Sequence, residues 1–480
     1  MDENSRPCPG CSERDRKIVE LMRRIDELVK RVAELEKRLD DKERAAKRQA
    51  APFSKGPPKA QPKKPGRKAG NKHGQHGHRP PPPQDAIEET LEATLPEACP
   101  DCGGAIQEDD NIDEQFQTDI PTQPVRRRFR IHKGCCKKCG RRVRGRHPLQ
   151  TSDATGAAAS QIGPNAQASI VYLNKRCGLS YGKIADHLKE ANGIDIKPST
   201  ATRIVLRAAD KLEPVYEEIQ ESTKTAEVIT PDETGWRNGG RLVWLHAWVT
   251  DQSTCYVIDP HRSANALEKV IGLDYSGTLI HDGASTYDRF SQALHQQCVA
   301  HALRRAHKLA TNLTGRDKLF PRQVIDLMQG ALEIRDAYHQ GELDRADLEI
   351  AFEMCCADLY RLTAGPRSNQ LNDTFANHLH NHGPEWFLFL LEPGQPATNY
   401  LAEQALRLPI SNRKIFGGNR TDAGCKAQVI TCSTIQTCRQ QKRSAFAFIR
   451  DAVCGVARSI FAAITGKSSD PDMTMPITIS

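Results

Sequence analysis

Long apolar runs are missing from this 480-residue sequence: no uninterrupted apolar stretch of about 18 residues or more occurs. Such a stretch is what a transmembrane helix requires, so we expect no membrane-spanning helix. The N-terminal sequence MDENSRPCPG also lacks the basic and then apolar layout of a secretory signal peptide. We therefore expect a soluble protein that stays in the bacterial cytoplasm. The length predicts about two to four domains, and 16 cysteines in such a chain indicate metal sites and free thiols rather than disulfides.

Acidic residues are almost missing from two segments, although the whole chain has a formal net charge of only +8. Residues 42–80 hold 12 Lys and Arg against one acid, and residues 126–147 hold 11 against none. Basic charge concentrated in this way is typical of a protein that binds a polyanion, most often DNA or RNA. A solvated surface or a charged linker would explain either segment alone. Two such segments, one of them inside a cysteine cluster, favour nucleic acid.

Residues 1–45 contain a cysteine pair and a short heptad repeat. The two apolar heptad positions are filled by Ile18, Ile25, Val32 and Leu39 and by Leu21, Leu28 and Leu35. β-Branched residues at one position and Leu at the other favour a parallel two-stranded coiled coil, hence a homodimer or larger assembly. The alternative is an amphipathic helix packed on its own domain. Residues 46–84 are rich in Pro, Gly, Lys and His and are predicted to form an extended linker.

Two C-x2-C knuckles lie within residues 85–150. Cys99 and Cys102 form the first and Cys136 and Cys139 the second, which is typical of a four-cysteine Zn²⁺ site. Cys135 is an alternative ligand, and unrelated buried thiols are the competing interpretation. A zinc domain here would present basic residues to the DNA backbone: Arg126, Arg127, Arg128, Arg130, Arg141 and Arg142. A third knuckle, Cys8 and Cys11, offers two ligands per chain, so zinc binding there would require a dimer.

Residues 155–218 read as a helix-turn-helix-like domain. We expect Ser199 to cap a helix that carries Thr200, Thr202 and Arg203 on its first turn, where a recognition helix meets DNA. Many helical pairs of this kind do not bind DNA. Strand-like runs follow at 225–231, 241–250, 254–258 and 277–283, with a helix near 263–271, which predicts a mixed α/β sheet. Residues 285–392 are mostly helical in pattern, with no strand to extend the sheet, and the tail 465–480 is predicted to be disordered.

Three carboxylates stand out in and after this predicted sheet. Asp232 is expected at the end of the first strand and Asp282 at the end of the fourth, and parallel neighbours would bring both to one edge. Glu403, at the start of a helical segment, could supply a third oxygen ligand for Mg²⁺ or Mn²⁺. Glu233 should point away from Asp232, because side chains alternate along a strand. Turn formation or ordinary surface exposure would explain each acid separately. A basic stretch that includes Arg407, Arg413 and Lys414 follows and suits DNA.

The chain resembles the insertion-sequence 66 (IS66) family of transposases. The resemblance rests on the heptad repeat, the linker KPGRKAGNKHGQHGHRPPP, the cysteine region, and the motifs PDETGW, HDGASTYD, CVAHALRRAH and NYLAEQALRLPISNRKIFGG. It implies an RNase H-like DDE catalytic core in two parts, residues 220–299 and 396–464, with a helical insertion at 300–395. It also implies Asp232, Asp282 and Glu403 as the metal-binding triad.

The resemblance departs from the family pattern around the last acid and includes one further match. The family has two Asn and an Arg around its last acid, where this chain has Tyr400 and Gln404 in NYLAEQALR, so contacts around the acid or end specificity could differ. Cys298 and His301 match a C-x2-H element of the family, for which metal binding and helix packing are the two interpretations.

These features together predict a DNA transposase, a polynucleotidyl transferase of the DDE type encoded by a mobile element. It would hydrolyse a phosphodiester at the element ends and join the freed 3′-hydroxyl to target DNA, acting in DNA recombination and associating with the nucleoid. Double-stranded DNA, a second copy of the chain and small element-encoded accessory proteins are the expected partners. The alternatives are a transposase-derived DNA-binding regulator without strand transfer, and a nuclease that only hydrolyses.

Overall fold

The computed structural model describes residues 21–25, 27–28, 31–32, 34, 81–91, 94–97, 100–105, 114–118, 120, 123–156, 160–262 and 264–462. Several predictions fall outside the described residues. They concern Cys8, Cys11, Cys99, most of the predicted linker and the tail 465–480. The chain divides into two units, Met1–Asp119 and Ile120–Ser480, which we describe separately. Of the described helices, none is long and apolar enough to cross a membrane.

The first unit contains a helical stretch in the predicted heptad segment. Residues 21–25, 27–28, 31–32 and 34 are helical, and Arg23 pairs with Glu27 one turn on at 2.6 Å. The heptad residues Leu21, Ile25, Leu28 and Val32 are all exposed on it. A helix with an exposed apolar stripe is what one strand of a coiled coil presents, but the second strand remains a prediction. The only other described element of this unit is the 3₁₀ turn η1, Gln84–Ala86.

The second unit begins with a small antiparallel hairpin made of β1 (Lys133–Cys135) and β2 (Arg142–Arg144). The hairpin turn carries the knuckle Cys136–Cys139 and is closed by two hydrogen bonds. The Cys136 N–H donates to the Arg141 carbonyl at 2.8 Å, and the Gly140 N–H donates to the Cys136 carbonyl at 2.9 Å. Gly140 has a positive φ of 72°, which a glycine adopts without strain.

Three helices follow the hairpin: α2 (Pro164–Lys175), α3 (Tyr181–Asn192) and α4 (Pro198–Lys224). Ser180 caps α3 through its side chain, and Ile184, Ala185 and Leu188 bury the inner face of that helix. The predicted Ser199 cap of α4 is wrong, because Lys197 is the N-cap residue and Pro198 opens the helix. Proline is favoured at the first helical position, since its missing N–H would have no partner there. Ser199 is therefore already inside the helix.

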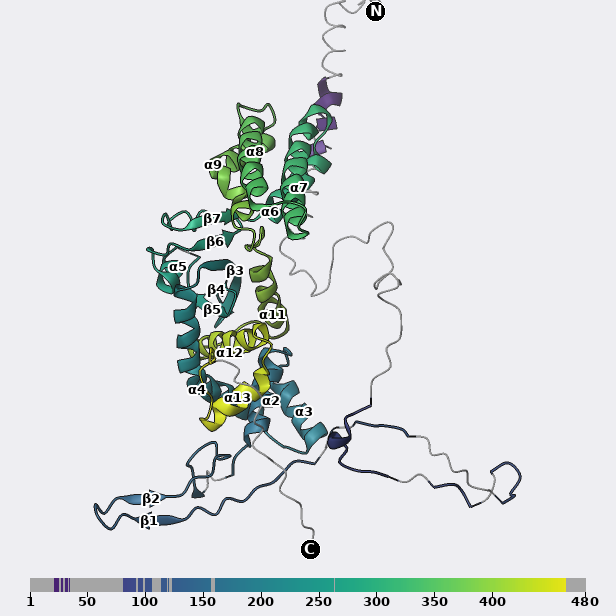
Figure 1. Cartoon of the computed structure of the whole chain (residues 1–480), viewed down its shortest axis with the longest axis vertical. Coiled ribbons are helices and arrows are strands. Elements are labelled where there is room, and N and C mark those ends of the chain that lie inside the picture. Colours follow the sequence, from purple (N-terminus) through teal and green to yellow (C-terminus); the bar gives the residue numbers. More distant parts are fainter. Residues whose placement is uncertain are drawn as a thin grey trace, which may run out of the picture. The chain divides into compact units, whose positions relative to one another are not determined.

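A five-stranded mixed sheet lies at the centre of the second unit, in the order β5-β4-β3-β6-β7 (Figure 1). The strands are β3 (Val228–Asn238), β4 (Arg241–Val249), β5 (Thr254–Asp259), β6 (Thr278–His281) and β7 (Leu294–Gln297). Strands β3, β4 and β5 are antiparallel neighbours, whereas β6 and β7 run parallel to β3. Helix α5 (Ala264–Ile271) connects β5 to β6. This mixed sheet fits the predicted RNase H-like core.

Two details of the sheet differ from the sequence-based expectation. Strand β7 extends the sheet beyond β6, although residues 285–392 were expected to hold no further strand. Asp232 does not end its strand, since β3 continues to Asn238 and pairs with β4 through a tight turn. That turn is built by Gly239 and Gly240, whose φ values of 57° and 83° suit a hairpin turn of this kind.

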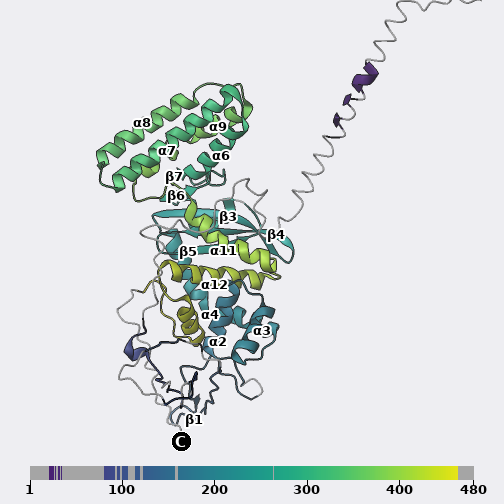
Figure 2. The same ribbon diagram turned by 90° about the vertical axis from the view of Figure 1, so that its right-hand side faces the viewer.

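The helices of the second unit form two groups, one packed with the sheet and one inserted after β7 (Figures 1 and 2). Helices α4, α11 (Tyr400–Phe416), α12 (Asp422–Gln440) and α13 (Ala445–Cys454) share one hydrophobic core with α2, α3 and the sheet. The segment between β7 and α11 forms a second, separate core. Its elements are α6 (Val299–Asn312), η3 (Gly315–Lys318), α7 (Leu319–His339), α8 (Arg345–Thr363), α9 (Gln370–His382), η4 (Gly383–Trp386) and α10 (Leu388–Leu391).

Candidate active site

The register of two parallel strands sets the first two acids side by side. Val228 of β3 is the partner of Thr278 in β6, and Ile229 is the partner of Leu279, an offset of 50 residues in both pairs. Continuing the same offset places Asp232 level with Asp282, which directly follows β6. The paired part of the two strands ends before Pro231, which has no N–H to donate to a neighbouring strand. Both carboxylates therefore leave the same carboxyl-terminal end of the parallel pair.

Asp232 is held in an electrostatic environment that disfavours its charged form. Its pKa is raised from 3.8 to about 7. Burial is the largest cause, and the negative charges of Glu233, Asp282 and Glu403 add to the rise. The Glu233 N–H donates to Asp232 Oδ1 at 2.9 Å and opposes the shift in part. The charges of both other acids of the predicted triad thus act on Asp232, which shows that the fold brings the three side chains near one another.

Glu403 lies in the first turn of α11 and is paired with two basic side chains of α6. Arg304 Nη2 donates to Glu403 Oε1 at 2.7 Å, and His301 Nε2 lies 3.7 Å from the same oxygen. In the part of the chain that the structure describes, no three His, Cys, Asp or Glu side chains are arranged to hold a metal ion. The donor chemistry still fits a hard divalent cation, because the negative charges of Glu233, Asp282 and Glu403 all act on Asp232 and carboxylate oxygens are the ligands that such cations prefer.

Glu233, which neighbours Asp232 on β3, is bound to other residues. Its side chain is only 5% exposed and pairs with Arg262 at 2.6 Å. The Tyr287 hydroxyl donates to Glu233 Oε2 at 3.1 Å, and Arg262 lies over the Trp244 ring. Glu233 therefore fastens the segment after β5 and the segment after Asp282 to strand β3. Sequence reasoning missed Arg262 and Tyr287, although Tyr287 stands in the motif HDGASTYD.

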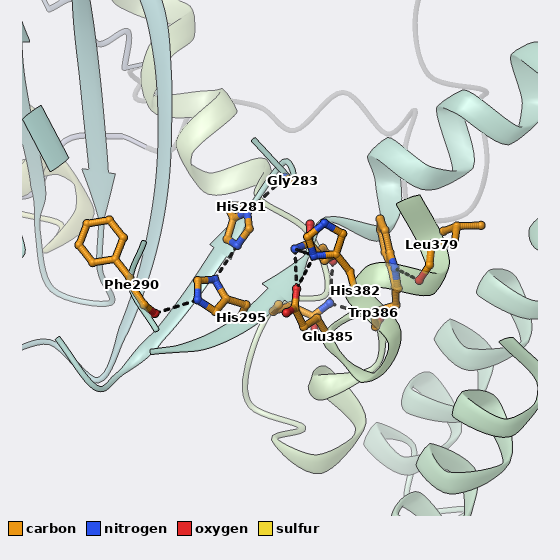
Figure 3. Close-up of polar contacts among 10 residues, drawn as sticks. His281, Gly283, Phe290, His295, Leu379, His382, Glu385 and Trp386 are labelled. Atoms are coloured by element: carbon orange, nitrogen blue, oxygen red, sulfur yellow. Dashed lines mark hydrogen bonds and ion pairs between the residues drawn. The ribbon is translucent and has the colours of Figure 1, made fainter. Parts of the chain in front are cut away.

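A chain of hydrogen-bonded histidines fixes the backbone on either side of Asp282 (Figure 3). The Phe290 carbonyl can only accept, so His295 donates to it from Nε2 at 3.0 Å. His295 Nδ1 must then accept from His281 Nε2 at 2.9 Å, which leaves His281 Nδ1 to accept the Gly283 N–H at 3.2 Å. Burial lowers the pKa of His281 to about 3, which keeps its ring neutral. The Asp282–Gly283 peptide is thereby anchored to the sheet.

The helical insertion reaches the same turn from the other side. Gly283 has a φ of 85°, and a Cβ there would lie 2.9 Å from Gln297 Oε1 and 3.2 Å from His378 Cε1. Gln297 Nε2 donates to Glu385 Oε2 at 2.7 Å, and Glu385 pairs with His382 at 2.9 Å (Figure 3). The glycine is required because the backbone is left-handed there and the insertion packs directly against it. The turn that carries Asp282 is held by both the sheet and the insertion.

Cys298 and His301 lie where α6 begins, next to the start of α11. The Asn399 N–H donates to Cys298 Sγ at 3.4 Å, and burial raises the pKa of this thiol. The Asn399 amide atoms and His301 Nδ1 are buried without a hydrogen-bond partner in the described residues. The contacts of Cys298 are those of helix packing. The orphaned amide lies one turn before Glu403, whose N–H donates to the Asn399 carbonyl at 3.2 Å.

The predicted DNA-binding residues are exposed on three elements. Those on and beside the β1–β2 hairpin are exposed, and so are Arg407 and Lys414 on α11. Arg203 is exposed too, but on the second turn of α4 and not on the first, because the helix begins at Pro198. Arg413 differs, because it is half-buried and its Nη1 lies 3.5 Å from Thr234 Oγ1. Thr234 is two residues beyond Asp232 and so shares its face of β3. Arg413 thus brings positive charge to the strand that carries the first acid.

The described part of the cysteine cluster consists of free thiols. Cys102, Cys135, Cys136 and Cys139 form no disulfide, and Cys135 donates from Sγ to the Gly140 carbonyl at 3.0 Å. The backbone N–H groups of Cys139 and Lys138 lower the pKa of Cys136, which favours the thiolate that a metal ion needs. The four-cysteine set remains a prediction because Cys99 lies outside the described residues.

Comparison with known proteins adds a family to this geometry. The family model described as Transposase IS66 family matches residues 159–427, which is more than half of the chain. The matched range begins just before α2 and ends within α12, so it includes the sheet, the insertion and all three acids. None of the curated proteins compared with the chain matches it.

Proposed function

The chain belongs to the IS66 family of transposases, and on that basis we propose that it cuts and joins DNA with the acids Asp232, Asp282 and Glu403. Water would open a phosphodiester at the end of the mobile element and leave a 3′-hydroxyl. That hydroxyl would then displace a 3′-oxygen from a phosphodiester of the target strand, which joins the two DNAs without net loss of phosphodiester bonds. The observation that carries the proposal is the 50-residue register of β3 and β6, which aligns Asp232 with Asp282.

The three acids would hold one or two Mg²⁺ or Mn²⁺ ions through carboxylate oxygens. When bound, such ions activate an oxygen nucleophile and stabilise the leaving oxygen of a phosphodiester. The strand register, which sets Asp232 level with Asp282, and the histidine contacts that hold the Asp282–Gly283 peptide support this assignment. The raised pKa of Asp232 supports the assignment, because a bound cation would stabilise the charged form of Asp232 that burial and the neighbouring carboxylates disfavour.

DNA binding would use the exposed basic residues on several elements. We propose that the β1–β2 hairpin, stabilised by Zn²⁺ on Cys99, Cys102, Cys136 and Cys139, contacts phosphates through its arginines. Arg203 would contact the element end, whereas Arg407, Arg413 and Lys414 would line the DNA path beside β3. The exposed heptad helix would pair two copies of the chain, so that two element ends are held together.

A strand-transfer assay on the DNA that flanks the gene of this protein tests the proposal directly. The wild-type chain is compared with Asp232→Asn in the presence of Mg²⁺ or Mn²⁺, and binding to the same DNA is measured in parallel. We expect Asp232→Asn to abolish cleavage and joining while DNA binding remains, because the amide is a poor ligand for a hard cation but leaves the basic surfaces intact.

The possible outcomes separate the proposed function from its rivals. Cleavage that survives Asp232→Asn would refute the assigned site. DNA binding by the wild-type chain without any metal-dependent cleavage would indicate a regulator derived from a transposase. Cleavage without joined products would indicate a nuclease that only hydrolyses.

A further inference from the structure

Arg304 is a cation placed at the edge of the acidic site by the first helix of the insertion. Besides the bond to Glu403, its Nη2 lies 2.9 Å from His301 Nε2, and its Nε donates to the Ala300 carbonyl at 3.3 Å. The arginine side chain is 59% exposed and that of Glu403 is 33% exposed. The guanidinium therefore still faces solvent, and in the described residues Nη1 has no hydrogen-bond partner.

The neighbouring arginine on α6 is used differently. Arg305 packs its guanidinium over the ring of Phe375, a core residue of the insertion, at 4.6 Å, and burial lowers its pKa. Lys308, one turn beyond Arg304, is exposed and lies on the same side of the helix. Of these three cations only Arg304 forms an ion pair with Glu403 in the described structure.

The Arg304–Glu403 pair is suited to exchange partners. A divalent cation that binds Glu403 competes with Arg304 for the same carboxylate oxygen. A DNA phosphate offers the released guanidinium two oxygens, which match its planar fork better than any single carboxylate oxygen. Because the ion pair is half-exposed, breaking it costs little free energy. Both members of the pair would then face a new opposite charge.

We propose that Arg304 is a further catalytic residue, which leaves Glu403 when divalent cations bind and then contacts a non-bridging oxygen of the reacting DNA phosphate. The proposal rests on the proposed function, because it needs Glu403 in the metal-binding set. A guanidinium in this position stabilises the negative charge that accumulates on the phosphate during transfer. In the resting protein the same side chain neutralises Glu403.

Two measurements on the full-length protein test the exchange. The first is Mn²⁺ binding without DNA, followed by electron paramagnetic resonance. The second is the cleavage rate on element-end DNA at saturating Mn²⁺. The variants are Arg304→Ala, Arg304→Lys and the matched control Lys308→Ala, which removes one positive charge from the same side of α6.

Removing Arg304 should change the two measurements in opposite directions. We expect Arg304→Ala to bind Mn²⁺ about two- to fivefold more tightly, since a half-exposed ion pair no longer competes. Its cleavage rate should fall about 100-fold, as for the loss of one preorganised donor to a transition state. Arg304→Lys keeps the charge, so its cleavage rate should be roughly tenfold higher than that of Arg304→Ala. Lys308→Ala should match the wild type in both measurements.

Several results would overturn the inference. Unchanged or weaker Mn²⁺ binding by Arg304→Ala would exclude competition for Glu403. Unchanged cleavage by that variant, or no recovery in Arg304→Lys, would exclude a phosphate contact, and a Lys308→Ala variant that behaves like Arg304→Ala would reduce the effect to general charge. A wild-type chain that neither binds Mn²⁺ nor cuts DNA would instead refute the proposed function itself.

Discussion

Replacing Asp232 by asparagine should stabilise the metal-free protein while it abolishes cleavage. Asp232 is half-buried among Glu233, Asp282 and Glu403, so its negative charge is unfavourable in the folded state. The asparagine side chain is close to that of aspartate in shape, and its oxygen could still accept the Glu233 N–H that Asp232 Oδ1 accepts at 2.9 Å. The substitution therefore removes the charge and keeps the contact.

The sign and size of the effect follow from the pKa of Asp232. Its folded-state pKa of about 7 lies above the unfolded value of 3.8. Between pH 3.8 and about pH 7, Asp232 is therefore protonated more often in the folded chain than in the unfolded chain. The free energy of unfolding of the wild type then falls as the pH rises, by about 1.4 kcal/mol per unit and about 4 kcal/mol in all at full effect. Solvent screening of a half-buried group reduces this to roughly 2 kcal/mol.

Urea unfolding at pH 5 and pH 8.5, in the presence of a chelator, measures this difference. Tryptophan fluorescence reports on the sheet, since Trp236, Trp244 and Trp248 lie in β3 and β4. We expect Asp232→Asn to exceed the wild type in stability at pH 8.5, with a margin at least about 1 kcal/mol larger than at pH 5. Asp251→Asn, in the exposed turn after β4, is the control for removing a carboxylate at a solvent-exposed position.

Equal stability of Asp232→Asn and the wild type at pH 8.5, or a larger margin at pH 5, would refute the electrostatic argument. Added Mn²⁺ provides an internal check. It should stabilise the wild type more than the variant, because a ligand stabilises the state that binds it.

Two further predictions concern the Asp282 turn and the heptad helix. Gly283→Ala should lower the free energy of unfolding by about 1–3 kcal/mol and slow cleavage, since its Cβ would meet Gln297 Oε1 at 2.9 Å in a left-handed backbone; an unchanged melting temperature would contradict this. Leu28→Arg should convert the assembled protein to monomers in sedimentation experiments without changing the unfolding of the sheet, because Leu28 is 61% exposed on its helix. An unchanged sedimentation coefficient would show that the heptad residues do not join the chains.

Apolar periodicity predicted most of the sheet but not its fifth strand. Strand β7 is only four residues long, and Gln296 and Gln297 are buried in it. Glutamine in a sequence predicts a loop rather than a buried strand. Burying its amide costs free energy unless hydrogen-bond partners, which can come from distant segments, are present. Here Gln296 Oε1 accepts the Phe389 N–H at 2.8 Å, and Gln296 Nε2 donates to the Trp386 carbonyl at 3.3 Å. The insertion supplies these partners and makes the strand possible.

The sequence by itself determined the family, the candidate acids and the order of the main elements, because local motifs and hydrophobic patterns encode them. It could not determine how Asp232 and Asp282 meet, since strand register is set by pairing between distant residues. Nor could it show that Glu403 pairs with Arg304, or that Glu233 pairs with Arg262. The packing of α6, α11 and the sheet determines which side chains form these pairs. Charges from separate segments interact only after folding brings them within a few ångströms of each other.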